Sequence, residues 1–397
     1  MADPGFLVHA DPGEVLGLVN AATGPAARLV GAVYGASAHL HRAAGAGVRR
    51  QLLALDAARY GDRELAARIT AVPVANEPAA QWGVEWATGT RLERQLQNIV
   101  TGHTGRVRAV ATSAVAGRPV AVTGSDDKTV RVWDLATGES LGEPFLHGGA
   151  VLAVAVGVVK GLPVAVTGSE DGAVRVWDVA TGEPFCEPLI GHTGKVEAVT
   201  VVNGTMLAVT GSAEDETVLV WDLVTGEELD GLFAGHDDWV HAVAVTVSDG
   251  HVLAVTGGDD GTARVWGWDM GASWEAGELL TGHGGPVRAV AVADGSGLAV
   301  TGGDDGSVRV WDVATGGQIG EFLSGHPVGV LGLPEVDGEA RVITGSGDGV
   351  VRMWDLATGE PIGPELLFPS SVRAVAVGPD GRLVVGFGSE VAVLARR

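Results

Sequence analysis

Six tryptophans recur at an almost constant interval, and this spacing limits the fold more than any other feature of the chain. They stand 44, 44, 45, 45 and 43 residues apart, at Trp133, Trp177, Trp221, Trp266, Trp311 and Trp354. The segment VAVTGSDDKTVRVWDLATGE at 120–139 returns as VAVTGSEDGAVRVWDVATGE at 164–183. A period of this length predicts one supersecondary unit per repeat, each stacked on its neighbours, rather than a series of independent domains.

Each repeat contains three short runs rich in β-branched residues. In the first repeat they read VRAVAT, PVAVTGS and TVRVWDL, and a fourth, weaker run lies between the Trp-Asp pair and the next His. The second and third runs are separated by Asp-Asp-Lys, Glu-Asp-Gly or Asp-Asp-Gly, which are residues of tight hairpin turns. The pattern therefore predicts four antiparallel strands per repeat.

These motifs resemble those of the WD-repeat family over about residues 82–397. The resemblance rests on Trp-Asp pairs at 133–134, 177–178, 221–222, 311–312 and 354–355, and on Gly-His pairs at 102–103, 191–192, 235–236, 282–283 and 325–326. Three units depart from it. The second has Leu146-His147, the fourth has Trp266-Gly267-Trp268-Asp269, and the last, at 372–395, lacks the Trp, the His and the turn Asp.

Counting first strands gives seven units, so we expect an all-β, seven-bladed β-propeller of four-stranded antiparallel blades. The chain ends just after the third strand of the seventh unit. A ring needs a closed last blade, because an open one exposes a blade-sized apolar surface. We therefore expect residues of about 88–100 to add the missing outer strand. Whether 82–86 are also strand or only linker stays open.

Residues 1–80 read as a small α-helical N-terminal domain with a linker, ahead of a propeller at 81–397. Apolar residues at three- and four-residue spacing predict four short helices, and Pro73, Asn76 and Pro78 mark the linker. This segment resembles the helical stretch that precedes WD propellers in bacterial multidomain signalling NTPases. That resemblance implies either the sensor end of a longer signalling protein or a stand-alone relative of such proteins.

Charge and composition exclude several classes of partner. The formal charge is −23, and residues 81–397 carry all of it, with 19 basic and 42 acidic side chains. Such a surface repels nucleic-acid phosphates and anionic membranes, so we expect neither as a partner. The single cysteine, Cys186, and the acidic start without an apolar run favour a cytoplasmic protein, which we expect to be monomeric. Only Lys128, Lys160 and Lys195 are lysines, and this composition, dominated by Ala, Gly and Val, indicates a high-GC bacterial genome.

The recurring His, Thr, Asp and Trp could be mistaken for six catalytic sites. A structural role explains them better, because a buried indole N–H needs an acceptor and the Thr hydroxyl can in turn donate to the imidazole. We find no P-loop, no zinc-protease motif and no nucleophile elbow in the sequence. We therefore predict no catalytic residue, no metal and no cofactor.

The family resemblance implies a partner-binding face made by the loop before each innermost strand and the turn between the second and third strands. The residues there are Arg106, Arg108, Asp126, Leu152, Glu170, Lys195, Glu197, Glu214, Trp239, His241, Asp259, Arg288, Asp304 and Arg373. Trp239 is a candidate apolar anchor, although local packing would also explain it. Arg108, Arg288 and Arg373 are candidate carboxylate clamps, and the alternative is that these charges pair with one another.

The function predicted on this basis is a non-catalytic scaffold that binds a protein or peptide on that face. One alternative is a sensor or autoinhibitory propeller in a bacterial signalling NTPase system. An alternative of another class is a propeller enzyme that acts in the central channel. An enzyme would need unrepeated catalytic groups converging on the axis, whereas the polar groups here repeat with the blades.

Overall fold

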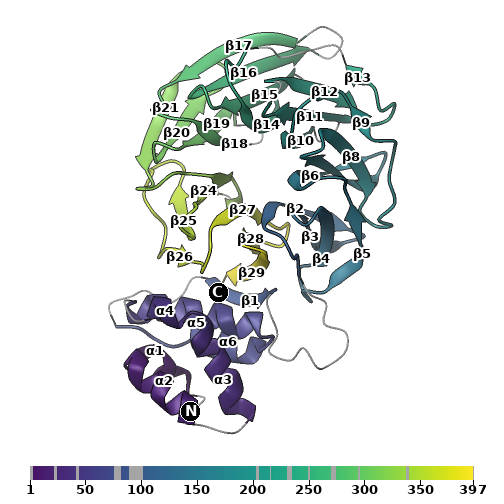
Figure 1. The fold of residues 1–397 in the computed structure, drawn as a ribbon. Helices are drawn as coiled ribbons and strands as arrows, with labels where there is room; N and C mark the ends of the chain where they lie inside the picture. The colour runs from purple at the N-terminus through teal and green to yellow at the C-terminus, as the bar shows by residue number, and fades with distance from the viewer. Residues whose placement is uncertain are drawn as a thin grey trace.

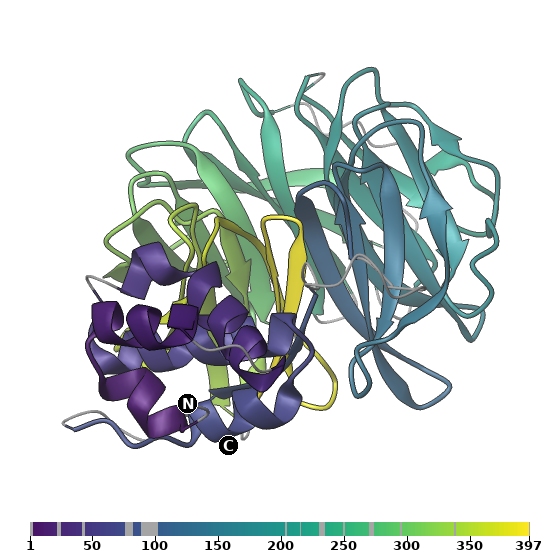
Figure 2. The same ribbon diagram turned by 60° about the horizontal axis from the view of Figure 1, so that its bottom comes forward.

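Seven sheets stand side by side around a central axis, and a bundle of helices lies beside the ring (Figure 1). The computed structural model describes residues 3–21, 25–41, 44–75, 82–88, 102–202, 205–214, 216–229, 235–248, 251–269, 274–293, 296–336 and 339–396. The view of Figure 2 shows the helices packed against one side of the ring, next to its last blade. The predicted seven-bladed propeller with N-terminal helices is confirmed.

Six described helices occupy the N-terminal part, where the sequence predicted four. They are α1 (Pro4–His9), α2 (Pro12–Ala21), α3 (Pro25–Ala36), α4 (Ala38–His41), α5 (Ala46–Arg59) and α6 (Arg63–Thr70). The first was not predicted, although its start is capped by Asp3, whose carboxylate accepts from the backbone N–H of Gly5. The apolar stretch that begins at Pro25 forms two helices, α3 and α4, rather than one. Short helices with weak caps are the ones whose number is hardest to read from periodicity.

Each blade is a four-stranded antiparallel path, and the strands follow one another in chain order in the first five blades. Blade 1 consists of β2 (Val107–Val115), β3 (Arg118–Ser125), β4 (Thr129–Asp134) and β5 (Ser140–Leu146). Blade 2 consists of β6 (Val151–Val159), β7 (Leu162–Ser169), β8 (Ala173–Asp178) and β9 (Leu189–Ile190). Blade 3 consists of β10 (Val196–Val202), β11 (Leu207–Ser212), β12 (Val218–Asp222) and β13 (Glu228–Leu229). Blades 4 and 5 consist of β14 (Val240–Ser248), β15 (His251–Gly258), β16 (Thr262–Asp269), β17 (Trp274–Thr281); and β18 (Val287–Ala293), β19 (Leu298–Gly303), β20 (Ser307–Asp312), β21 (Gln318–Leu323).

The last two blades depart from this order. Blade 6 consists of β22 (Val330–Gly332), β24 (Glu339–Gly345), β25 (Val350–Asp355) and β26 (Leu366–Leu367), with β23 (Glu335–Val336) paired to β24. Blade 7 takes three strands from the C-terminal end and one from far upstream, in the order β27 (Val372–Val377), β28 (Leu383–Phe387), β29 (Glu390–Arg396) and β1 (Trp82–Ala87).

The strand that closes the ring is β1, which lies six residues earlier than the predicted 88–100. It pairs antiparallel with β29, with Trp82 opposite Arg396 and Ala87 opposite Ala392. Of the predicted range only Thr88 lies among the described residues, and its backbone N–H donates to the carbonyl of Val391. The question left open for 82–86 is therefore answered, because these residues are a strand of the last blade.

The side chains of β1 explain why it fits there. Trp86 is 3% exposed, and its Nε1–H donates to the carbonyl of Leu135 in blade 1 at 2.9 Å. Its ring centroid lies 6.2 Å from that of Trp133. Trp82 packs on the cluster of buried residues that includes Leu55 of α5. The closing strand thus joins blade 7 to blade 1 on one side and to the helices on the other.

Small residues on the second strands let neighbouring blades approach. A Cβ added at Gly168 would lie 2.5 Å from Cγ1 of Val196, the first residue of the next innermost strand. The same contact recurs around the ring, for example between Gly124 and Val151 at 2.6 Å. A side chain here would force the blades apart, which explains why this glycine returns in every repeat, Gly386 of blade 7 included.

Hydrogen bonds join the His, Thr, Trp and Asp of blade 1 as predicted. Trp133 Nε1 donates to Thr123 Oγ1 at 2.9 Å, and this oxygen lies 2.6 Å from His103 Nε2. His103 Nδ1 lies 3.0 Å from the Asp127 carboxylate. Burial acts to raise the pKa of Asp127, but the hydrogen bonds from His103 and Thr129 outweigh it and hold the pKa well below its usual value. Blades 4 and 5 repeat this arrangement.

Blade 2 inserts a guanidinium into the network. Arg175 Nη1 lies 3.0 Å from His147 Nδ1 and 3.1 Å from the Asp171 carboxylate, so the imidazole accepts from an arginine. Burial, with the charge of Arg175, lowers the pKa of His147 to about 4. In blade 3 the bonds from Trp221 and His192 to Thr210 are present, and Asp215 lies outside the described residues.

Blade 6 lacks one bond because its first loop is two residues shorter. His326 Nδ1 lies 2.7 Å from Asp348, but Thr344 bonds to Trp354 and not to His326 in the described structure. Val328 is the counterpart of Val107 in blade 1, because each valine packs on the second-strand glycine of the preceding blade. A Cβ added at Gly302 would lie 2.5 Å from Cγ1 of Val328, and one added at Gly386 would lie 2.8 Å from Cγ1 of Val107. Only two positions separate Val328 from His326, against four between His103 and Val107 in blade 1.

The helical bundle is joined to the propeller by polar contacts as well as by packing. Arg59 of α5 forms ion pairs with Asp56 at 2.8 Å and with Glu390 of β29 at 2.5 Å. Gln51 Oε1 accepts from the backbone N–H of Leu367 at 3.2 Å. The contact is also apolar, because Leu55 is 2% exposed within a propeller cluster. The helices and blade 7 therefore form one continuous packed unit.

Candidate partner-binding face

The innermost strands of six blades carry a β-bulge at their second residue. The pairing of β2 with β3, for instance, shifts between Val107 and Ala109, which leaves Arg108 as the extra residue. Bulges re-aim a side chain, and here they bring one residue per blade to the entrance of the central channel. These bulged residues are Arg108, Leu152, Glu197, His241, Arg288 and Arg373.

The six bulged residues line a cavity of about 460 Å³, which we call the channel mouth. Gly329, Pro327 and Gly347 complete its wall on the side of blade 6. Figure 1 looks along the axis that this cavity occupies, with β2, β6, β10, β14, β18 and β27 around it. All six bulged residues were predicted from the sequence as members of the binding face, and the structure brings them together at one opening.

A second set of predicted residues stands at the turns between the second and third strands. These turns reach the same end of the propeller, because antiparallel strands alternate in direction, and we call this end the top face. Five blades have an acidic residue in this turn, as its first residue in four of them and as its second, after Ala213, in blade 3. Blades 6 and 7 have glycine as the first residue. The residues are Asp126, Glu170, Glu214, Asp259, Asp304, Gly347 and Gly388.

Two of the three predicted carboxylate clamps are already paired within the chain. Arg108 binds Asp126 through two bonds, at 2.7 and 3.1 Å. Arg288 lies 2.8 Å from Asp259 and 3.0 Å from Asp304. For Arg108 and Arg288 the structure therefore has the arrangement of the alternative interpretation, in which the charges of the face neutralise one another.

Lys195 is shared in the same way. Its ammonium lies 3.3 Å from Glu170 and 3.6 Å from Glu214, the turn residues of blades 2 and 3. These groups are well exposed, so the pairs contribute little to stability and can exchange for a partner's charges.

His241 lies between two carboxylates at the channel mouth. Its Nδ1 is 2.8 Å from Glu197, and its Nε2 is 2.9 Å from Asp259. Burial acts to raise the pKa of Glu197, but the hydrogen bond with His241 and the charges of Arg108 and Arg288 bring it below the usual value. Glu197 therefore keeps its negative charge at neutral pH.

Arg373 and Arg106 differ from the other cations of the face. Among the described residues neither side chain has an ion-pair or hydrogen-bond partner. Burial, with the nearby charges of Arg108 and Arg106, lowers the pKa of Arg373, while Asp126 opposes this shift. Burial is the larger cause of this shift, and the two neighbouring arginines add to it.

Trp239 is an exposed aromatic on the loop before β14. Its side chain is 44% exposed, and its ring meets that of His241 edge-on, with centroids 6.2 Å apart. Local packing therefore leaves much of the indole in contact with solvent, next to the channel mouth. An apolar surface beside charged groups suits a protein partner.

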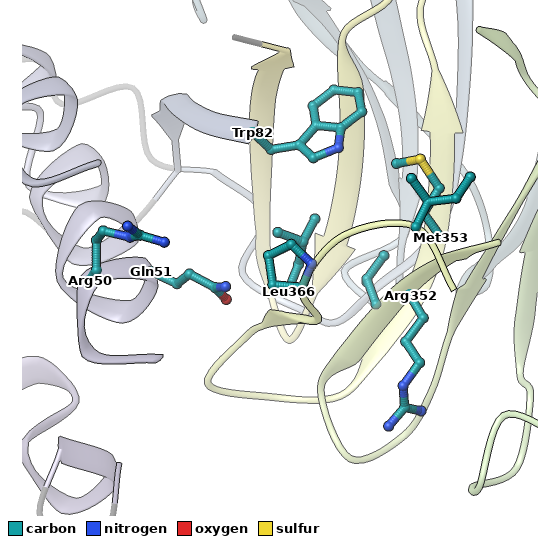
Figure 3. Close-up of a pocket in the computed structure, with 9 residues that line it drawn as sticks. Arg50, Gln51, Trp82, Arg352, Met353 and Leu366 are labelled. Carbon is teal, nitrogen blue, oxygen red and sulfur yellow. The ribbon is translucent and has the colours of Figure 1, made fainter. Parts of the chain in front are cut away.

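A second pocket lies between α5 and the outer strands of blades 6 and 7. Figure 3 shows Arg50 and Gln51 on the helix, facing Trp82, Met353 and Leu366 across the gap. Its volume is only about 20 Å³, room for a single water molecule. The pocket is a small packing defect between the helices and the propeller.

Sequence reasoning missed the part of the face that blade 6 contributes. None of the residues named for the face belongs to blade 6, where the shortened loop makes Pro327 the counterpart of Trp239 and Gly329 the counterpart of Arg108. The interval from His326 to the buried Val328 was the available signal. Blade 6 therefore presents no long side chain at either position.

Comparison with protein families agrees with this geometry. The family model "WD domain, G-beta repeat" matches residues 94–134, 142–178, 184–222, 228–267, 276–312 and 317–355, more than half of the chain. The chain belongs to the WD40 repeat family. WD40 propellers are generally non-catalytic and generally bind proteins. The seventh unit, at 372–395, lies outside the six matches.

Short segments of the chain are also similar to curated proteins. A stretch of 59 residues is 44% identical to the pre-mRNA-splicing factor PRP46 of Eremothecium gossypii, covering 15% of this chain and 12% of that protein. A stretch of 62 residues is 37% identical to human and bovine pleiotropic regulator 1, covering 16% of this chain and 10% of each relative. The matched segments thus span about a tenth of these relatives.

No described helix is long and apolar enough to span a membrane. In the described part of the chain, no group of His, Cys, Asp and Glu side chains is arranged to hold a metal ion.

Proposed function

We propose that this protein is a non-catalytic scaffold whose partner protein docks on the top face of the propeller, over the channel mouth. The exposed indole of Trp239 is the observation that carries the proposal. Large aromatic side chains are among the commonest energetic centres of protein interfaces. The surrounding ion pairs would then form a polar rim.

The recurrent polar groups support a scaffold over an enzyme in the channel. The buried His and Thr of blade 1 bond to Trp133 and Asp127 of the same blade, so they hold strands together. The bulged residues that do face the channel differ from blade to blade, as a surface that recognises one partner would. The resemblance of residues 1–80 adds a candidate partner, a bacterial signalling NTPase.

Affinity capture with the immobilised full chain tests this proposal. The expected result is that proteins bound by the wild type are lost with Trp239→Ala and retained with Glu183→Ala. Glu183 is an exposed residue of the turn after β8, at the opposite end of the propeller, which makes it a matched surface control. Capture that survives Trp239→Ala and is lost with Glu183→Ala would refute the assignment of the face.

A further inference from the structure

The charges of the top face are divided between two halves. Among the fourteen predicted face residues, blades 2 to 5 have five carboxylates against two cations and one imidazole. These are Glu170, Glu197, Glu214, Asp259 and Asp304, with Lys195, Arg288 and His241. Blades 7 and 1 place three arginines against one carboxylate, namely Arg106, Arg108 and Arg373 with Asp126. A positive area therefore stands on a propeller whose residues carry the whole charge of −23.

Two features leave the positive half without internal neutralisation. Asp126 is occupied by the two-bond contact with Arg108. The turns of blades 6 and 7, where a further carboxylate would stand, begin with Gly347 and Gly388. The backbone of Gly388 accepts from the N–H of Val107, so this turn lies directly beside the first strand of blade 1. No carboxylate of the described chain forms an ion pair with Arg106 or Arg373.

We propose that Arg106 and Arg373 form an anion subsite that binds the carboxylates of an acidic segment of the partner protein. This inference rests on the proposed function and adds the chemistry of the partner. Guanidinium groups bind carboxylates through charge-assisted bonds that are about twice as strong as neutral ones. Arg373 lines the channel mouth, so an acidic side chain that reaches the opening would meet it there.

The surroundings favour a short acidic segment over a polyanion. A nucleic acid that reached these arginines would also meet the acidic half of the face, and the two would repel each other across a distance comparable to the Debye length of about 8–10 Å. One or two carboxylates at the subsite avoid that repulsion, and basic residues farther along the segment would meet the acidic half. The division of charge thus also sets the direction in which the segment crosses the mouth.

Selection from a random library of 12-residue peptides displayed on phage tests the inference on the full chain. We expect the selected peptides to be enriched in Asp and Glu. Their affinity should fall by about 10–100-fold when Arg106→Ala and Arg373→Ala are combined, the effect of losing one or two charge-assisted bonds. Arg118→Ala is the matched control, because Arg118 is an exposed arginine at the other end of blade 1, and it should change the affinity less than about twofold.

The outcomes separate this inference from the proposed function. The anion subsite alone would be overturned if the selected peptides carry no excess of Asp or Glu and bind the double arginine variant as tightly as the wild type, while Trp239→Ala still abolishes their binding. Peptides that are unaffected by Trp239→Ala and by the arginine substitutions, but are lost with Glu183→Ala, would overturn both. Tighter binding of phosphoserine peptides than of their aspartate versions would reassign the subsite from carboxylate to phosphate.

Discussion

Replacing Thr123 by valine isolates the hydrogen bonds of blade 1 from its shape. The two side chains are nearly isosteric, so the substitution removes one hydroxyl and leaves the packing in place. That hydroxyl accepts from Trp133 Nε1 at 2.9 Å and lies 2.6 Å from His103 Nε2. Thr123 itself is fully buried, and so are both partner groups. Water cannot replace the lost bonds.

The expected loss of stability follows from the two buried groups, Trp133 Nε1 and His103 Nε2, that would have no hydrogen-bond partner. A buried polar group left without a partner costs about 1–3 kcal/mol, so Thr123→Val should lower the free energy of unfolding by about 2–6 kcal/mol. Thr123→Ser is the matched control. It keeps the hydroxyl and removes one buried methyl group, which costs only about 1 kcal/mol.

Guanidinium unfolding followed by tryptophan fluorescence provides the comparison. The midpoint should fall in the order wild type, Thr123→Ser, Thr123→Val, with an unchanged dependence on denaturant. Valine at least as stable as serine would contradict the network, because shape would then matter more than the hydroxyl. In blade 7 the counterpart is Val385, fully buried among Leu394 and other apolar residues. There the reverse change, Val385→Thr, should destabilise by about 1–3 kcal/mol.

Three further substitutions test the closure, the acid sensitivity and the attachment of the helices, all by denaturant unfolding. Trp86→Ala should lower the free energy of unfolding by about 3–5 kcal/mol, because the indole is buried where β1 closes the ring. Trp239→Ala, which removes an exposed indole, should change it by no more than about 0.5 kcal/mol. Equal losses for the two variants would contradict the role of β1 in closing the ring. In the folded protein the pKa of His147 is about 4, so between pH 6.5 and 4 the unfolded chain binds one proton more than the folded one, and the free energy of unfolding should fall as the pH drops through this range. His147→Gln should reduce this pH dependence by about 1.4 kcal/mol per pH unit. An unchanged pH dependence would refute the buried neutral imidazole. Arg59→Met should lower the free energy of unfolding by about 3–5 kcal/mol, because it leaves the buried carboxylate of Asp56 and the partly buried carboxylate of Glu390 without their ion pairs. Adding Glu390→Gln should recover part of this loss, and full additivity would contradict the pairing with Glu390.

The repeated architecture could be predicted because each repeat contains its own strand and turn residues. The run TVRVWD alternates as a strand should, and Asp-Asp-Lys supplies the turn before it, so the pairing of Ala121 with Trp133 follows from local rules. The same rules fix which residue precedes each innermost strand. This is why the bulged residues of the channel mouth could be named before their contacts were known.

The closing strand was misplaced because outer strands carry little sequence signal. β1 pairs on one side only, with β29, and its register shifts between Val84 and Trp86. Its identity depends on Trp86 reaching the carbonyl of Leu135 in another blade, a contact between distant parts of the chain. Local periodicity contains no information on such a contact.

The ion pairs of the face could not be predicted for a similar reason. Arg108 and Arg373 occupy equivalent positions in their blades, yet one is tied to Asp126 and the other has no such partner in the described residues. The difference arises from the turn of the same blade, where Gly388 replaces the acidic residue. Only the three-dimensional arrangement shows which charges remain for a partner.

Hydrogen–deuterium exchange on the complex with a captured partner tests the central claim most directly. The account predicts that binding slows exchange in the loops before the innermost strands, at 104–106 and 237–239. Exchange at the turns of the opposite end, at 136–138 and 180–182, should stay unchanged. Protection confined to the opposite turns, with the loop of Trp239 exchanging as fast as in the free protein, would contradict the assignment of the top face as the binding surface.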